Sequence, residues 1–241
     1  MNRRLLVGLT TGAALVAIGV VLYPVGSTVL RLGLIAALCV VWFGVTVLMW
    51  ERKTLRVVFL LMPALLAAPF LLPTRVLHRD ELRDDYVRCM AALERTPYVW
   101  GGESSLGIDC SGLPRHALRR ALFGYGLRNA DGGALRRALE LWWFDSSARA
   151  LGRGYRGYTV PLAISGTVAA IDSSRLTPGD LAVTSDGRHL LAYAGGDNWI
   201  QADPGVGSVV TLNARTAHNP WFECEVSIHR WSVLAGPTRA S

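Results

Sequence analysis

Cysteine is scarce in this 241-residue sequence, which has four of them and no Cys-X-X-Cys pair. Disulfide-stabilised scaffolds and structural zinc sites need more cysteines at closer and more regular spacing, so both classes are excluded. We predict that the protein requires no metal ion and no cofactor. Cys89 and Cys224 are interpreted as two separate core residues. A disulfide bridge between them is the alternative if this part of the chain lies outside the cytoplasm.

Acidic residues are nearly missing from the first 73 positions, which carry one acidic and six basic side chains. The remaining residues carry 17 acidic and 19 basic side chains, so most of the formal net charge of +7 comes from the N-terminal segment. Basic residues that flank apolar runs are a signal of membrane topology. We therefore expect contact with a lipid bilayer and no binding of nucleic acid.

The N-terminal segment contains long apolar runs, and we predict that residues 1–74 form a membrane anchor. Three uncharged runs cover residues 5–23, 33–50 and 57–72, and about 20 apolar residues are needed to cross a bilayer. A cleaved signal peptide is the competing interpretation of the first run. The lack of a small-X-small cleavage site and the further apolar runs favour a retained anchor. The third run is short and contains Pro63 and Pro69, which also fits a re-entrant or interfacial segment.

The placement of basic residues favours three full crossings. Arg3 and Arg4 precede the first run, and Arg52, Lys53 and Arg56 separate the second from the third. Both groups belong on the cytoplasmic side by the positive-inside rule. Three crossings then place everything after residue 73 outside the cytoplasm.

The second predicted domain comprises residues 75–241 and combines helices with an antiparallel sheet, an α+β fold. Apolar residues spaced by three or four predict an amphipathic helix over residues 79–95, and further helices are expected at 111–123 and 134–143. Runs rich in β-branched and aromatic residues, separated by glycine-containing turns, predict five strands in an antiparallel meander. These strands cover residues 181–184, 189–194, 198–203, 208–213 and 223–233.

Cys110 is the candidate nucleophile. It follows a glycine-containing loop and stands at the expected start of a helix, where the partial positive charge of the helix N-terminus favours the thiolate. A small buried core cysteine is the alternative interpretation. The polar or very small neighbours Asp109, Ser111 and Gly112 favour a site that a substrate backbone approaches closely.

Two blocks of sequence around this cysteine resemble the signature of the NlpC family, papain-like cysteine peptidases that cut bacterial cell-wall peptides. The first block reads Pro-Tyr-Val-Trp-Gly-Gly at residues 97–102 and Asp-Cys-Ser-Gly-Leu at 109–113. The second reads Leu-Thr-Pro-Gly-Asp-Leu at residues 176–181 and continues with His189, Tyr193, Gly195 and residues 200–202. The resemblance covers residues 84–234. It implies a papain-like fold in which the nucleophile helix packs on a small antiparallel sheet.

A cysteine nucleophile needs a base and a third group that orients the base. His189 begins a predicted strand after an Asp-Gly turn and matches the family's histidine, so we assign it as the base. The family usually has a histidine where this chain has Gln201. The Gln201 amide oxygen can accept the imidazole N–H, so we favour Gln201 as the third member. Asp203, two residues further along the same strand face, is the alternative.

The resemblance also implies a substrate-binding role for Tyr98, Asp109 and Ser111, which match positions that grip a free amine or line the oxyanion site in some family members. Residues 124–161 depart from the family pattern and form a predicted insertion. Its Arg, Tyr and Trp side chains fit a lid or a partner surface, and they equally fit a decoration that packs on the domain.

The sequence thus predicts a membrane-anchored cysteine peptidase that hydrolyses peptidoglycan stem peptides. By family resemblance, the bond would lie between γ-D-glutamate and a diamino acid. The expected location is the inner membrane of a bacterium, with the catalytic domain periplasmic or otherwise extracytoplasmic. A catalytically weak or inactive wall-binding or scaffold protein is one alternative. A lipid acyltransferase on a related fold is another, although in such enzymes histidine precedes cysteine, and here Cys110 precedes His189.

Overall fold

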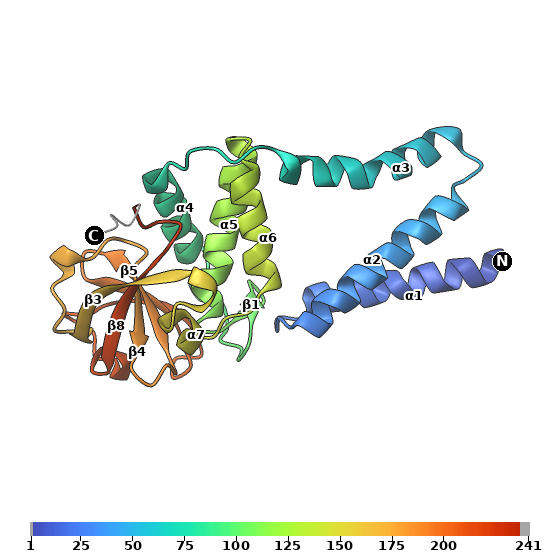
Figure 1. Cartoon of the computed structure of the whole chain (residues 1–241). Helices are drawn as coiled ribbons and strands as arrows, with labels where there is room; N and C mark the ends of the chain where they lie inside the picture. The colour runs from blue at the N-terminus through green and yellow to red at the C-terminus, as the bar shows by residue number, and fades with distance from the viewer. Residues whose placement is uncertain (1, 237–241) are drawn as a thin grey trace.

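The computed structural model describes residues 2–236, which form a helical anchor and a mixed α+β domain (Figure 1). The anchor helices are α1 (Arg3–Leu22), α2 (Thr28–Leu48), α3 (Lys53–Ala67) and the short 3-10 helix η1 (Ala68–Leu71). Within the described chain, three helical stretches are long and apolar enough to cross a membrane: α1, α2, and α3 together with η1 over Lys53–Leu71. The predicted apolar runs are therefore helical, and the third has a spanning length despite Pro63 in its interior.

Small residues bring the first two anchor helices close together. Gly44 of α2 lies against Thr10 of α1, both of them buried in a hairpin whose other surfaces carry exposed leucine and valine. Trp42 reaches the third helix, where its indole N–H donates to the Phe59 carbonyl at 2.9 Å. The turn between α1 and α2 faces the α+β domain (Figure 1). The three helices thus present an apolar outer surface of the kind a bilayer covers.

The α+β domain follows η1. Its helices are α4 (Arg79–Ala91), α5 (Gly112–Arg128), α6 (Gly132–Trp143), α7 (Ala148–Gly152) and the 3-10 helices η2 (Tyr155–Gly157), η3 (Ser173–Arg175) and η4 (Pro220–Phe222). A two-stranded hairpin contains β1 (Glu103–Ser104) and β2 (Gly107–Ile108). The main sheet contains β3 (Thr159–Thr167), β4 (Leu181–Thr184), β5 (Leu190–Gly195), β6 (Asn198–Asp203), β7 (Ser208–Asn213) and β8 (Glu225–Trp231).

All neighbouring strands of the main sheet are antiparallel, in the order β3-β8-β4-β5-β6-β7. The α+β class and the five predicted strands are confirmed, but the prediction of one sequential meander is wrong at its end. β8 pairs with β4 and not with β7, because the edge of β7 is occupied by residues that precede the cysteine. There Arg95 N–H donates to the Val209 carbonyl at 2.9 Å, and Tyr98 N–H donates to the Gly207 carbonyl at 2.8 Å.

The strand β3 was not predicted. Its first residues lie inside the predicted insertion, and a register shift between Pro161 and Ser165 interrupts its pairing with β8. Most of the strand is only partly buried at the edge of the sheet, so it lacks the continuous apolar pattern that marks the central strands.

Helices cover one face of the sheet, and loops cover the other. Leu82 and Tyr86 of α4 and Leu118 of α5 pack in one buried cluster with Leu181 and Ala192 of the sheet. On the opposite face, Leu191, Trp199 and Ile228 pack with Val168 and Phe222 from the connecting loops. Leucine and tyrosine spaced by three or four along α4 and α5 thus fix these helices across the sheet.

The inserted region packs partly on the domain. Asp131 caps α6 by accepting hydrogen bonds from the N–H groups of Gly133 and Ala134, and Leu135 and Leu141 of α6 are buried. Cys89 and Cys224 are both free thiols. This agrees with the interpretation of them as two separate residues and not as a disulfide bridge.

Candidate active site

Cys110 lies between β2 and α5, in a segment held from both ends by Asp109. One Asp109 carboxylate oxygen, Oδ1, accepts hydrogen bonds from the backbone N–H groups of Ser111 and Gly112 and from the Ser111 hydroxyl, while Oδ2 accepts from the Gly101 N–H. A Cβ atom on Gly112 would collide with the Gly102 carbonyl oxygen, so glycine is required there. Asp109 therefore joins the glycine-containing loop to the start of the nucleophile helix.

The sulfur of Cys110 is buried against the chain around Arg188 and Leu190, at the start of β5. The residue is 6% exposed, and its Sγ lies 3.8 Å from the Arg188 carbonyl oxygen. Burial, together with the nearby Asp109 carboxylate, raises the pKa of the thiol to about 12, although backbone N–H groups of Leu190, Ser111 and Cys110 act in the opposite direction. Loss of solvation thus opposes the thiolate that the helix start favours.

His189 immediately precedes β5. The residues on both sides of it, Arg188 and Leu190, lie against the cysteine sulfur. The imidazole is buried and stacks on Trp221, with ring centroids 4.0 Å apart and an interplanar angle of 17°. Its Nε2 lies 2.6 Å from the Gln201 amide oxygen. Because that oxygen can only accept, Nε2 carries the proton, and Nδ1 keeps the lone pair that a base needs. Burial lowers the pKa of His189 to about 4, so the ring is neutral near pH 7.

Both candidates for the third position lie in one buried chain of polar side chains. Gln201 contacts His189 directly, and its amide N–H donates to Asp203 Oδ2 at 3.3 Å. Asn219 donates to the same Asp203 oxygen at 2.7 Å. The Asp203 carboxylate thus fixes which way the Gln201 amide points, and its hydrogen-bond connection to the histidine runs through Gln201.

An open cleft of about 740 Å³ runs along the cysteine. Tyr98, Asp109, Cys110 and Ser111 all line it, so the structure brings the predicted substrate-binding residues to one surface. Burial, with further contributions from Cys110 and Asp109, raises the pKa of Tyr98 to about 12, which keeps the phenol as a hydrogen-bond donor. The inserted region also reaches the cleft, through residues 145–150 and Tyr155.

Sequence reasoning missed three residues that shape this site. Trp221 and Asn219 come from η4 and its N-cap, far along the chain from the cysteine. The Asn-Pro pair at 219–220 is a turn signal, but its position beside the histidine depends on the tertiary fold. Gly26 of the anchor also lines the cleft, and nothing in the sequence connects it with Cys110.

Cys110 thus lies just before the N-terminus of α5, and His189 lies just before the strand β5. The model of the NlpC/P60 family matches residues 95–225, more than half of the sequence, and the chain belongs to this family. The predicted family is therefore confirmed. No curated protein matches the chain significantly.

Several solved structures are similar to the chain. An NlpC/P60 family protein from Bacillus cereus is 21% identical with a TM-score of 0.40, and the match covers 66% of this chain and 41% of that protein. The P60 domain of an antigen from Mycobacterium avium subspecies paratuberculosis is 18% identical with a TM-score of 0.39, and the match covers 66% of this chain and 100% of that domain. The peptidoglycan hydrolase RipB from Mycobacterium tuberculosis is 19% identical with a TM-score of 0.37, covering 64% and 68% of the two chains.

Proposed function

We propose that this protein is a membrane-anchored cysteine peptidase that hydrolyses peptidoglycan stem peptides. The observation that carries the proposal is the buried line His189–Gln201–Asp203, which binds Nε2 of a neutral imidazole. His189 lies between Arg188 and Leu190, whose backbone groups contact the sulfur of Cys110. Membership of the NlpC/P60 family supports a bacterial wall peptide as substrate. The bond that we propose is the one between γ-D-glutamate and a diamino acid.

In the first half-reaction, Cys110 attacks the scissile carbonyl carbon. The sulfur forms a bond to that carbon as the thiol proton passes to Nδ1 of His189. The Cys110 thiol and the His189 imidazole are therefore both neutral until substrate is present. The Cys110 backbone N–H, at the start of α5, is positioned to donate to the developing oxyanion. The C–N bond then breaks, and the amine leaves with the proton from His189.

In the second half-reaction, the same imidazole removes a proton from water. The hydroxide equivalent attacks the thioester carbon, the C–S bond breaks, and the proton returns to the sulfur. Gln201 holds one tautomer of His189 throughout, while Trp221 fixes the plane of the ring. Tyr98 and Ser111 are proposed to bind the polar end of the stem peptide beside the Asp109 carboxylate.

The anchor is proposed to hold the catalytic domain outside the cytoplasm of a bacterium, at the inner membrane. The turn between α1 and α2 contacts the domain, whereas Arg52 and Lys53 lie at the opposite end of α2. With the basic turn inside, the domain lies outside. A reporter that is active only in the cytoplasm, fused after Ser241, is expected to be silent; an active fusion would contradict this topology.

The test of the peptidase uses the full chain in detergent micelles with purified muropeptides, and product masses identify the bond cut. We expect cleavage by the natural chain and by Cys39→Ala, a matched control in the exposed surface of the anchor, and none by Cys110→Ala. Equal cleavage by Cys110→Ala would refute the cysteine mechanism.

The wall-binding or scaffold alternative gains support from the protonated, buried thiol, which is less reactive than a thiolate. Retention of wall peptides by both the natural chain and Cys110→Ala, with no cleavage by either, would favour that alternative.

A further inference from the structure

Arg31 is a charged residue near the start of the second membrane helix, and it is 4% exposed. Its guanidinium donates to Glu103 Oε2 at 2.9 Å and to the Trp143 carbonyl at 3.1 Å, so both partners belong to the α+β domain. A buried charge is costly unless it is paired and hydrogen-bonded. This ion pair therefore fixes the outer end of the anchor against the domain.

Glu103 passes the connection to the catalytic cleft. It is buried, and its other carboxylate oxygen, Oε1, accepts a hydrogen bond from Arg115 of the nucleophile helix. Arg115 in turn donates to Asp145 at 2.6 Å, and both of these residues line the cleft that contains Cys110. One ionic network thus extends from a membrane helix to the wall of the active site.

The anchor loop, defined as residues 24–27, adds backbone contacts to the same region. Gly26 N–H donates to the Gly101 carbonyl at 3.2 Å, and Glu103 N–H donates to the Pro24 carbonyl at 2.9 Å. Between them, Val25 forms a β-bridge with Gly102. Two of these residues also hold Asp109, because the Gly102 carbonyl accepts the Asp109 N–H at 3.1 Å and the Gly101 N–H donates to its carboxylate at 2.9 Å.

We propose that the anchor loop is a working wall of the active site and that Arg31 is a positioning residue for Cys110. Gly26 lines the cleft directly. Arg31 holds Glu103 and, with it, the segment 101–103. This segment in turn holds Asp109, which fixes the start of α5. The membrane anchor then does more than tether the domain, since separating the two would loosen the segment that carries the nucleophile. The turnover part of this proposal rests on the proposed peptidase function.

The test compares Arg31→Ala, Arg31→Lys and Arg52→Ala in the full chain, all in the same micelles. Arg52 is an exposed arginine at the other end of α2 and serves as the matched control. We expect kcat/KM to fall about 10- to 100-fold in Arg31→Ala, since small misplacements of reacting groups have effects of this order. The loss should lie mainly in kcat, and Arg31→Lys should recover part of it.

A second readout keeps the two proposals separate. The rate at which iodoacetamide alkylates Cys110, followed by peptide mass spectrometry, requires no turnover, and we expect it to change several-fold in Arg31→Ala and not in Arg52→Ala. Gly26→Ala is an independent variant, because its Cβ would crowd the Arg31 guanidinium and the Glu103 carboxylate without removing either charge. If Arg31→Ala and Gly26→Ala both match Arg52→Ala in alkylation rate, the positioning role is refuted, whether or not the natural chain cuts muropeptides.

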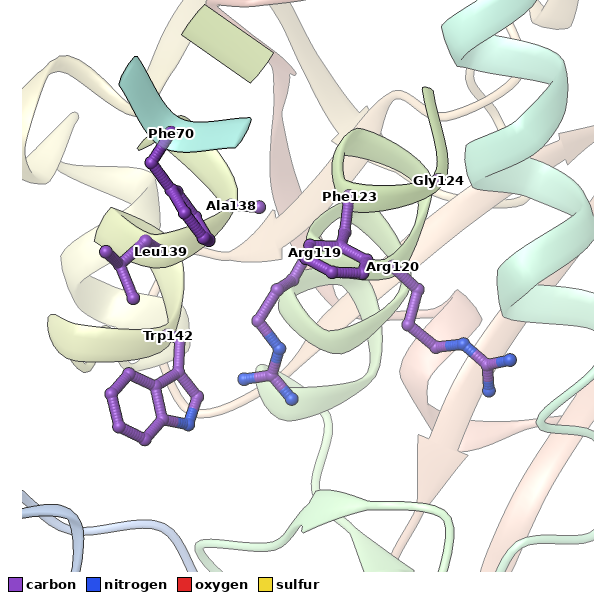
Figure 2. A pocket seen from close by; sticks show the side chains of 8 residues that line it. All are labelled: Phe70, Arg119, Arg120, Phe123, Gly124, Ala138, Leu139 and Trp142. Carbon is purple, nitrogen blue, oxygen red and sulfur yellow. The ribbon is translucent and has the colours of Figure 1, made fainter. Parts of the chain in front are cut away.

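A separate groove of about 480 Å³ lies between the end of the third membrane stretch and the domain. Figure 2 shows Phe70 of η1 above Leu139 and Trp142 of α6, with Phe123 and Arg119 of α5 on the other side. Phe123 and Leu139 are both exposed. Because η1 ends the third apolar stretch, this groove of aromatic rings and arginines lies where the bilayer surface meets the domain.

The charge of the groove is one-sided. Arg119 and Arg120 line it, and no acidic side chain does so in the described chain. Burial and the nearby Arg31 lower the pKa of Arg119 to about 10, although Asp145 acts in the opposite direction. Glu103, at 3.6 Å from Arg119, is already shared with Arg31 and Arg115. The geometry points to the head group of an anionic phospholipid, with its acyl chain along Phe70 and Phe123.

Nanodiscs of phosphatidylcholine alone, or mixed with phosphatidylglycerol, test this second site through the thermal unfolding midpoint of the domain. Phosphatidylglycerol should raise the midpoint of the natural chain. It should do the same for the control variant Arg175→Gln, which changes an exposed arginine elsewhere on the domain. It should not raise the midpoint of Arg120→Gln or of the double variant Arg119→Gln/Arg120→Gln. Equal shifts in all variants, or no shift in any, would refute the site. A shift produced by inorganic phosphate alone would refute the assignment to lipid.

Discussion

The anchor and the α+β domain use the same apolar side chains in opposite ways. Leu15 in α1 is 65% exposed, whereas Leu118 in α5 is 1% exposed and packs between helix and sheet. In the domain, buried polar groups form the line from His189 through Gln201 to Asp203. In the described part of the anchor, the buried charge is Arg31, and it is directed at the domain. Buried polar groups thus lie at the proposed site in the domain and at the proposed contact of the anchor, while others, such as Thr10 of α1 and Asp131 before α6, serve packing and capping.

The largest expected effect concerns the histidine of the domain. Replacing His189 with alanine removes the base, and we expect kcat for muropeptide cleavage to fall about 10²- to 10⁴-fold. The fold should survive, because Trp221 and Gln201 keep their other contacts. A variant that retains near-natural kcat would show that another group takes the thiol proton.

A matched pair of leucine substitutions would test the opposite packing of the two regions. Leu118→Ala should lower the free energy of unfolding by about 2–5 kcal/mol, because it leaves a cavity in a close-packed core. Leu15→Ala removes the same atoms from an outward-facing position and should cost far less. Stability is measured by denaturant titration of the full chain in micelles; similar losses would mean that Leu15 is packed against protein.

Gly44 and Gly12 form a second matched pair, both inside the anchor. A Cβ on Gly44 would collide with Thr10 of the neighbouring helix, whereas Gly12 has open space around it. Gly44→Val should therefore destabilise the helix hairpin by about 1–3 kcal/mol, in the range of overpacking effects. Titration with a denaturing detergent, followed by circular dichroism, would detect it. Equal behaviour of Gly12→Val would remove the evidence for close packing of α1 on α2.

The smallest expected effect is the pH dependence near neutrality. The lowered pKa of His189 and the raised pKa of Cys110 make a neutral pair the active resting form. Because protonated His189 cannot accept the thiol proton, kcat/KM should stay level from pH 6 to 8 and decline only as the pH falls toward about 4. Alkylation of Cys110 should rise about tenfold per pH unit over the same range, because only the thiolate reacts. A level alkylation rate would indicate a preformed thiolate–imidazolium pair.

Local patterns sufficed to predict the nucleophile helix and four strands from residue 181 to 213, because helix periodicity and strand alternation are local. The contact of His189 with Gln201 was predicted from the family resemblance. The position of β8 beside β4 was not predictable, because it depends on residues 95–98 occupying the edge of β7. The same holds for Trp221 on His189 and for Arg31 on Glu103, pairs that the fold brings together over long sequence separations.

Asp109 shows how one residue can satisfy two interpretations. The motif implies a role in binding substrate, and the structure places the residue in the cleft. Its carboxylate also accepts four hydrogen bonds from the protein around the helix start. We therefore expect that replacing Asp109 would disturb the position of Cys110 as well as any contact with substrate.

The proposed mechanism requires Cys110 to form a covalent acyl-enzyme with a wall peptide. Mass spectrometry of the full chain, mixed with a stem peptide and quenched in acid within the first turnover, detects this species. We expect an added acyl mass on the peptide that contains Cys110, and no such mass in Cys110→Ala. Cleavage that proceeds with no adduct, or with an adduct on another residue, would contradict the mechanism.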